Sequence, residues 1–91
     1  MNKEKILQLR KQAHHLKPII LIGQKGLTEA VLTETNIALD AHECIKIKIG
    51  GCERDERPEI INQICQSLKA ELIDTIGHIA VIYRKNEQTK S

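Results

Sequence analysis

The chain has 91 residues, 41% of them hydrophobic, and a net charge of +2, which together predict one domain with a single core. No apolar run approaches the roughly twenty residues that a membrane-spanning helix needs, and the N-terminus lacks the apolar segment of a signal peptide. We therefore expect a cytoplasmic protein. Tyr83 is the only aromatic residue, which argues against nucleic-acid binders that stack bases on several exposed rings.

The charge is distributed unevenly along the chain. Residues 1–26 hold six Lys or Arg and one acid, whereas residues 27–83 hold five bases and ten acids. A basic N-terminal quarter favours contact with a polyanion. The alternatives are a solvated basic helix with no binding role and a basic helix that meets an acidic protein partner.

The N-terminal part predicts a helix followed by a strand. Ile6, Leu9, Ala13 and Leu16 recur with a helical period, which predicts a helix over residues 3–15. Residues 19–22 are four consecutive aliphatics of strand length. Because this run does not alternate with polar residues, we expect burial on both faces and hence a central strand.

A Gly-x-x-Gly turn joins this strand to a second helix, predicted over residues 28–41. Backbone N–H groups of such a turn, the positive end of the helix dipole and a lysine at the tip could together hold a phosphate. Taken alone, two glycines could equally serve only to make a tight turn. The residues of this predicted cradle are Gly23, Gln24, Lys25, Gly26 and Thr28, the last as helix N-cap.

The remaining sequence predicts a mixed sheet. Residues 45–49 alternate strictly, so this strand has one buried face and one wet face that bears Lys46 and Lys48. A third helix follows over about residues 55–69, and residues 71–76 and 79–84 form a hairpin around Gly77 and His78. The order α-β-α-β-α-β-β predicts an α/β fold of the two-layer α+β type, with a four-stranded mixed sheet, over residues 1–85. Residues 86–91 form a polar tail that we expect to be flexible.

Neither a metal centre nor a catalytic site is predicted. His42, Cys44 and Cys52 do not match the spacing of a closed zinc site. Cys44 with His42 is the only local pair of nucleophile and base, and nothing nearby supplies an oxyanion site. We expect no metal, no cofactor and no enzymatic activity, with reduced cysteines.

Several motifs occur in order along the chain: Ala13-His14-x-Leu16-Lys17-Pro18, the aliphatic strand, Gly23-x-x-Gly26-Leu27-Thr28, Ile45-Lys46-Ile47-Lys48-Ile49 and Ile82-Tyr83-Arg84. As a set, they resemble the CRM domain, named after chloroplast RNA splicing and ribosome maturation, and in particular its stand-alone bacterial YhbY-like members. The resemblance runs from about Lys5 to Arg84.

The resemblance implies a fold similar to the C-terminal domain of translation initiation factor three, and an RNA-binding protein that assists assembly of the large ribosomal subunit. The family's RNA-binding surface maps onto the Gly-x-x-Gly turn, and Arg10, Lys11 and Lys17 join it by their general basic character. We expect a monomer that recognises RNA by shape more than by sequence and binds neither membrane nor small molecule. The alternatives are a general nucleic-acid binder and a basic protein-interaction module, and the roles of Lys46, Lys48, Arg84 and Lys85 stay open.

Overall fold

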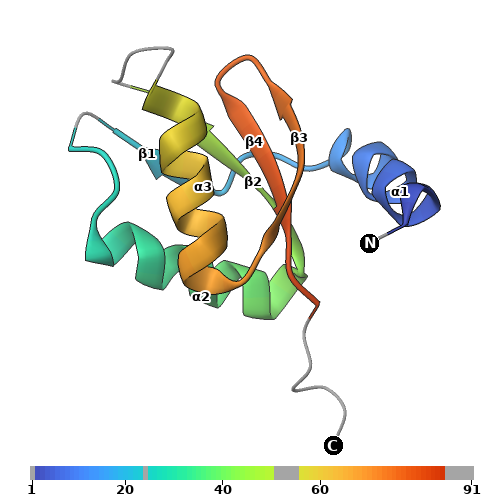
Figure 1. The fold of residues 1–91 in the computed structure, drawn as a ribbon, viewed down its shortest axis with the longest axis horizontal. Coiled ribbons are helices and arrows are strands. Elements are labelled where there is room, and N and C mark those ends of the chain that lie inside the picture. The colour runs from blue at the N-terminus through green and yellow to red at the C-terminus, as the bar shows by residue number, and fades with distance from the viewer. Residues whose placement is uncertain (1, 24, 51–55, 86–91) are drawn as a thin grey trace, which may run out of the picture.

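The computed structural model describes residues 2–23, 25–50 and 56–85 (Figure 1). The expected order of elements is confirmed. They are α1 (Lys3–Ala13), β1 (Ile20–Ile22), α2 (Glu29–His42), β2 (Cys44–Ile49), α3 (Glu56–Leu68), β3 (Glu71–Ile76) and β4 (Ile79–Tyr83). The predicted flexible tail, residues 86–91, lies outside the described residues.

The four strands form one mixed sheet in the order β1-β2-β4-β3. β1 pairs in parallel with β2, while β4 is antiparallel to both of its neighbours, β2 and β3. The predicted α+β class with a four-stranded mixed sheet is therefore confirmed. None of the described helices has the length and apolarity that crossing a membrane requires.

One face of the sheet is covered by α2 and α3. The alternation of β2 directs Ile45, Ile47 and Ile49 toward this layer, where each is 1% exposed. They pack in one cluster with Leu39 from α2 and Ile64 from α3, both completely buried. This cluster is the main hydrophobic core.

The opposite face is covered only in part, by α1. Leu9 and Ala13, two residues of the predicted helical stripe, pack against Cys44, Ile73 and Val81 in a second, smaller cluster. α1 ends at Ala13 instead of His15. Leu16, which follows the predicted helix directly, is 36% exposed, so it does not extend the packed stripe beyond Ala13.

The expectation that residues 19–22 form a central strand is wrong. β1 is an edge strand, and its burial alternates: Ile20 and Ile22 face the core, whereas Leu21 is 66% exposed. The reason is that α1 packs over β2, β3 and β4 and leaves β1 uncovered on that side. A continuous aliphatic run shows that both faces are apolar, but it does not show that both are covered.

Candidate nucleic-acid interface

The Gly-x-x-Gly turn connects β1 to α2 and is closed by its own backbone. The Gly26 N–H donates to the Gly23 carbonyl at 3.0 Å, and Gly26 has a φ of +74°. Residues other than glycine rarely adopt this left-handed backbone conformation, so the geometry of the turn requires a glycine at the second position. Lys25 precedes it and is exposed, while Gln24 lies outside the described residues.

Thr28 caps α2 as the sequence predicts. Its Oγ1 accepts a hydrogen bond from the Val31 N–H at 3.2 Å, and its carbonyl accepts the first helical bond, from Leu32. The N–H groups of Glu29 and Ala30 precede that first helical bond, and both residues are exposed. Since the Gly26 N–H already closes the turn, these two amides are the donors best placed for an anion.

The basic residues of α1 do not lie beside this turn. α1 contacts Cys44 and Tyr83, whereas the turn lies at the other end of the sheet, where the Gly50 N–H donates to the Ile22 carbonyl (Figure 1). The Arg10 Nε donates to the Ile73 carbonyl at 3.3 Å and lies 3.9 Å from Asp74. This arginine therefore helps to attach α1 to β3.

Lys11 and Lys17 are exposed, the first on α1 and the second in the segment that leads to β1. The structure thus brings together Gly23, Lys25, Gly26 and Thr28, and separates them from Arg10 and Lys11. Whether the two groups bind one ligand stays a prediction.

Arg84 makes long-range hydrogen bonds that the sequence did not predict. Its guanidinium donates to Asn36 Oδ1 at 2.8 Å, to the Asn36 carbonyl at 3.2 Å, to the Leu68 carbonyl at 3.0 Å and to Asp40 Oδ1 at 2.7 Å. The residue therefore connects the end of β4 to α2 and α3, on the face opposite α1. No local pattern identifies these partners, because they are 16 to 48 residues away in sequence.

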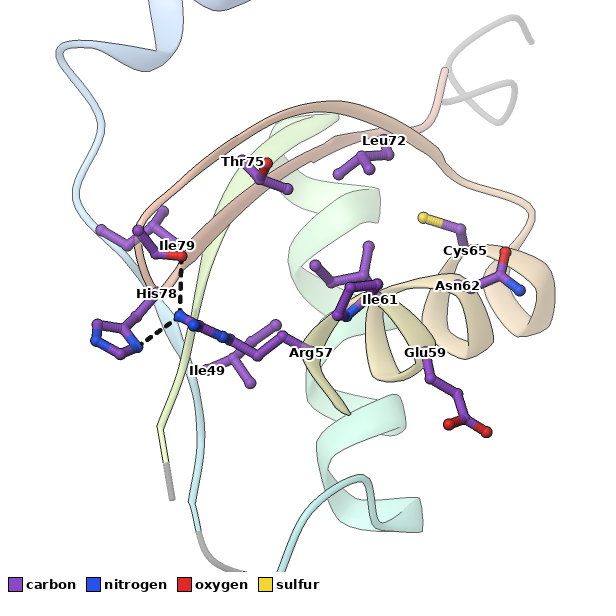
Figure 2. Close-up of a pocket in the computed structure, with 12 residues that line it drawn as sticks. Ile49, Arg57, Glu59, Ile61, Asn62, Cys65, Leu72, Thr75, His78 and Ile79 are labelled. Atoms are coloured by element: carbon purple, nitrogen blue, oxygen red, sulfur yellow. Dashed lines mark hydrogen bonds between the residues drawn. The ribbon is translucent and has the colours of Figure 1, made fainter. Parts of the chain in front are cut away.

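A groove lies between α3 and the β3–β4 hairpin (Figure 2). Cys65 and Leu72 lie at one end of it. At the other end, the Arg57 Nη1 donates to the Gly77 carbonyl at 3.0 Å and lies 2.7 Å from His78 Nδ1 (Figure 2). Because arginine only donates, this ring nitrogen accepts, and the contact connects the start of α3 to the hairpin.

The pKa values of the Cys44 and Cys65 thiols are shifted in the direction opposite to that of an activated nucleophile. Burial raises the pKa of both from the ordinary 9.0, with Lys46 partly opposing this for Cys44 and Glu71 adding to it for Cys65. Catalytic thiols require a lowered pKa. Within the described residues, no group of three His, Cys, Asp or Glu side chains is placed to hold a metal ion.

We expect iodoacetamide at pH 8 to alkylate Cys44 much more slowly in the folded protein than in urea. The buried thiol remains protonated, and only the thiolate reacts. The same shift links stability to pH: because the pKa of the Cys44 thiol is higher in the folded protein than in the unfolded chain, its contribution to the free energy of unfolding is complete below about pH 9. That contribution is lost as the pH rises through the folded pKa. Peptide mass spectrometry of timed samples measures the rate at each cysteine, and equal rates with and without urea would contradict the burial.

Comparison with known proteins assigns the chain to a family. Residues 1–84 match the CRS1 / YhbY (CRM) domain. An "RNA-binding protein" of Haemophilus influenzae is 48% identical over 82 residues, covering 90% of this chain and 83% of that protein. A "Probable RNA-binding protein" of Pseudomonas aeruginosa is 40% identical over 86 residues, covering 94% and 83%.

A solved structure agrees with this assignment. The solution structure of a Staphylococcus aureus protein, described as a candidate RNA binder, superimposes with a TM-score of 0.83 at 28% identity and covers 99% of this chain and 94% of that one. The match to the family model and the two relatives agree on the same domain over almost the whole length. The chain belongs to the CRM-domain family.

Proposed function

We propose that this protein binds RNA and that the Gly-x-x-Gly turn with the start of α2 is a phosphate-binding site. The observation that supports this most directly is the convergence of three features at one exposed place. They are the left-handed Gly26, the ammonium of Lys25 and the N-terminus of a fourteen-residue helix capped by Thr28.

The binding is electrostatic and positional. The amides of Glu29 and Ala30 donate to phosphate oxygens, Lys25 adds a mobile point charge, and the helix dipole favours the anion. Glu29 opposes the anion with its own charge, which makes Lys25 the more important residue. Phosphate contacts of this kind position the protein without selecting a base sequence.

The RNA that we propose is ribosomal RNA in precursors of the large subunit, where the protein assists assembly in the bacterial cytoplasm as a monomer without enzymatic activity. The names of the relatives support RNA as the ligand. The two alternatives make different predictions. A general nucleic-acid binder would bind DNA and RNA alike, and a protein-interaction module would keep its partner after nuclease treatment.

Replacing Lys25 by glutamine tests the phosphate site. We expect weaker RNA binding and a log–log salt dependence that is shallower by about 0.7 to 0.9 units, since one phosphate contact is lost. Fluorescence anisotropy with a labelled RNA at several salt concentrations measures both quantities. Lys69→Gln, which removes an equal charge at the far end of α3, is the matched control and should bind like the parent. An unchanged salt dependence in Lys25→Gln would contradict the proposed site.

Sedimentation of a cell extract tests the ribosomal assignment. We expect the protein to co-migrate with large-subunit precursors at moderate salt, and to be released at high salt or by the Lys25→Gln change. If the protein stays at the top of the gradient in every condition, the ribosomal role is wrong even if the purified protein binds RNA.

A further inference from the structure

The half of the sheet that α1 leaves uncovered presents one continuous row of side chains. The strand register places Leu21 beside Lys48, Lys48 beside Ile79, and Ile79 beside Ile76, so the row crosses all four strands. Alternation along β2 and β4 puts this row on the side of Cys44 and Val81, which is the side of α1. We call Leu21, Lys48, Ile79 and Ile76 the open row.

Two of the aliphatic side chains in the open row are unusually exposed. Leu21 is 66% exposed and Ile76 is 51% exposed, and Lys48, which lies between them in the row, is exposed as well. Aliphatic side chains gathered on one exposed sheet face are typical of a binding surface, unlike the same residues scattered singly. Asp74 lies one row away and is close to Arg10, so it is partly neutralised.

The open row lies at the same end of the sheet as the Gly-x-x-Gly turn. Lys48 is two residues before Gly50, whose N–H donates to the Ile22 carbonyl, and Gly23 follows directly. Lys46 occupies the next row toward α1 and is half-buried at the margin of that helix. The lysines at 25, 48 and 46 therefore follow one another from the turn across the sheet face toward α1.

Charge separates the two faces of the molecule. α1 has four bases and one acid, the segment to β1 adds Lys17, and β2 adds two lysines. α2, which covers the other face, has three acids and neither lysine nor arginine. A polyanion is therefore attracted to the face that carries the open row.

We propose that the open row is a second RNA contact, which binds an unpaired RNA segment that leaves the phosphate site at the turn. This inference rests on the proposed RNA-binding function. Lys48 and Lys46 neutralise successive phosphates, while Leu21 and Ile76 pack against riboses and base faces. An unpaired segment is the occupant that fits, because a duplex hides its base faces and would leave the aliphatic side chains without apolar contacts.

Two substitutions separate the charged part of this contact from its apolar part. We expect Lys48→Gln to weaken binding of a single-stranded RNA about three- to tenfold and to lower the salt slope by about 0.7 units. Leu21→Ala should weaken the same binding about threefold with an unchanged salt slope, since it removes apolar contact and no charge. A hairpin RNA of equal length should be little affected by Leu21→Ala.

Matched controls come from the opposite face. Lys69→Gln removes an equal charge, and Ile37→Ala truncates an aliphatic side chain that is 62% exposed on α2. Both should bind single-stranded RNA like the parent. Thermal unfolding of each variant checks that it is folded. We expect all of them to fold, because Leu21 and Lys48 are exposed and substitutions of exposed side chains change stability little.

The outcomes distinguish this inference from the function on which it rests. If Lys25→Gln weakens RNA binding but Lys48→Gln and Leu21→Ala do not, the open row is not an RNA contact and the phosphate site stands. Equal losses on hairpin and single-stranded RNA in Leu21→Ala would refute the assignment to unpaired RNA. If the parent binds no RNA at all, the proposed function itself fails.

Discussion

Replacing Arg84 by alanine is expected to lower the free energy of unfolding by about 3 kcal/mol. Its guanidinium makes four hydrogen bonds, two of them to the backbone carbonyls of Asn36 and Leu68, and its side chain is only 19% exposed. Hydrogen bonds from a charged donor contribute more than neutral ones, and their loss leaves acceptors without partners. Urea unfolding monitored by circular dichroism gives the change directly.

The neighbouring residue supplies the control for Arg84. Lys85 is exposed, so Lys85→Ala should change the free energy of unfolding by less than about 0.5 kcal/mol. Arg84→Lys should lie between the two, because an ammonium cannot reproduce the planar fork of donors. If Arg84→Ala is as stable as the parent, the four bonds do not hold the sheet to its helices. If folded Arg84→Lys loses RNA affinity, Arg84 also contacts RNA.

Replacing Gly26 by valine is expected to weaken RNA binding about five- to thirtyfold. The backbone at this residue has a φ of +74°, which costs a residue with a side chain about 1–2 kcal/mol and a β-branched one more. The free variant can relieve this strain by adopting a different turn conformation. RNA binding must then restore the left-handed conformation, so the affinity falls by that free-energy cost. Anisotropy titration of the folded variant measures the loss.

The cause is backbone conformation and not lack of space, because a Cβ at Gly26 would meet no atom within 4 Å. Asparagine tolerates the left-handed region, so Gly26→Asn should retain more affinity than Gly26→Ala, and Gly26→Val should retain least. Gly23 has neither a positive φ nor a close neighbour, so Gly23→Ala should be as stable as the parent. If the three Gly26 variants bind RNA equally well, the geometry of the turn does not matter for binding.

Local sequence determined the secondary structure and the start of α2. Alternation in residues 45–49 predicted a strand with one buried and one lysine-bearing face, and Thr28 was correctly identified as an N-cap. The order of helices and strands then restricted the fold to a small mixed sheet. These features were predictable because each depends on residues within a few positions of one another.

The site was only partly predictable for the same reason. The Gly-x-x-Gly turn and Lys25 are contiguous in sequence, so their proximity needed no tertiary information. The position of α1, by contrast, was unpredictable, because a basic helix that precedes the turn in sequence could have packed at either end of the sheet. The Gly26 N–H also closes the turn, and the sequence did not indicate that this donor is occupied.

Tertiary structure decided which apolar surfaces are covered and which distant residues meet. β1 is an aliphatic run on both faces, yet the packing of α1 over β2, β3 and β4 leaves Leu21 exposed. Arg84 reaches Asn36 and Asp40 only because β4 ends beside α2. The sequence of a segment therefore determines which of its faces are apolar. Which apolar faces become covered depends on how helices and strands that are distant in sequence pack around the small core.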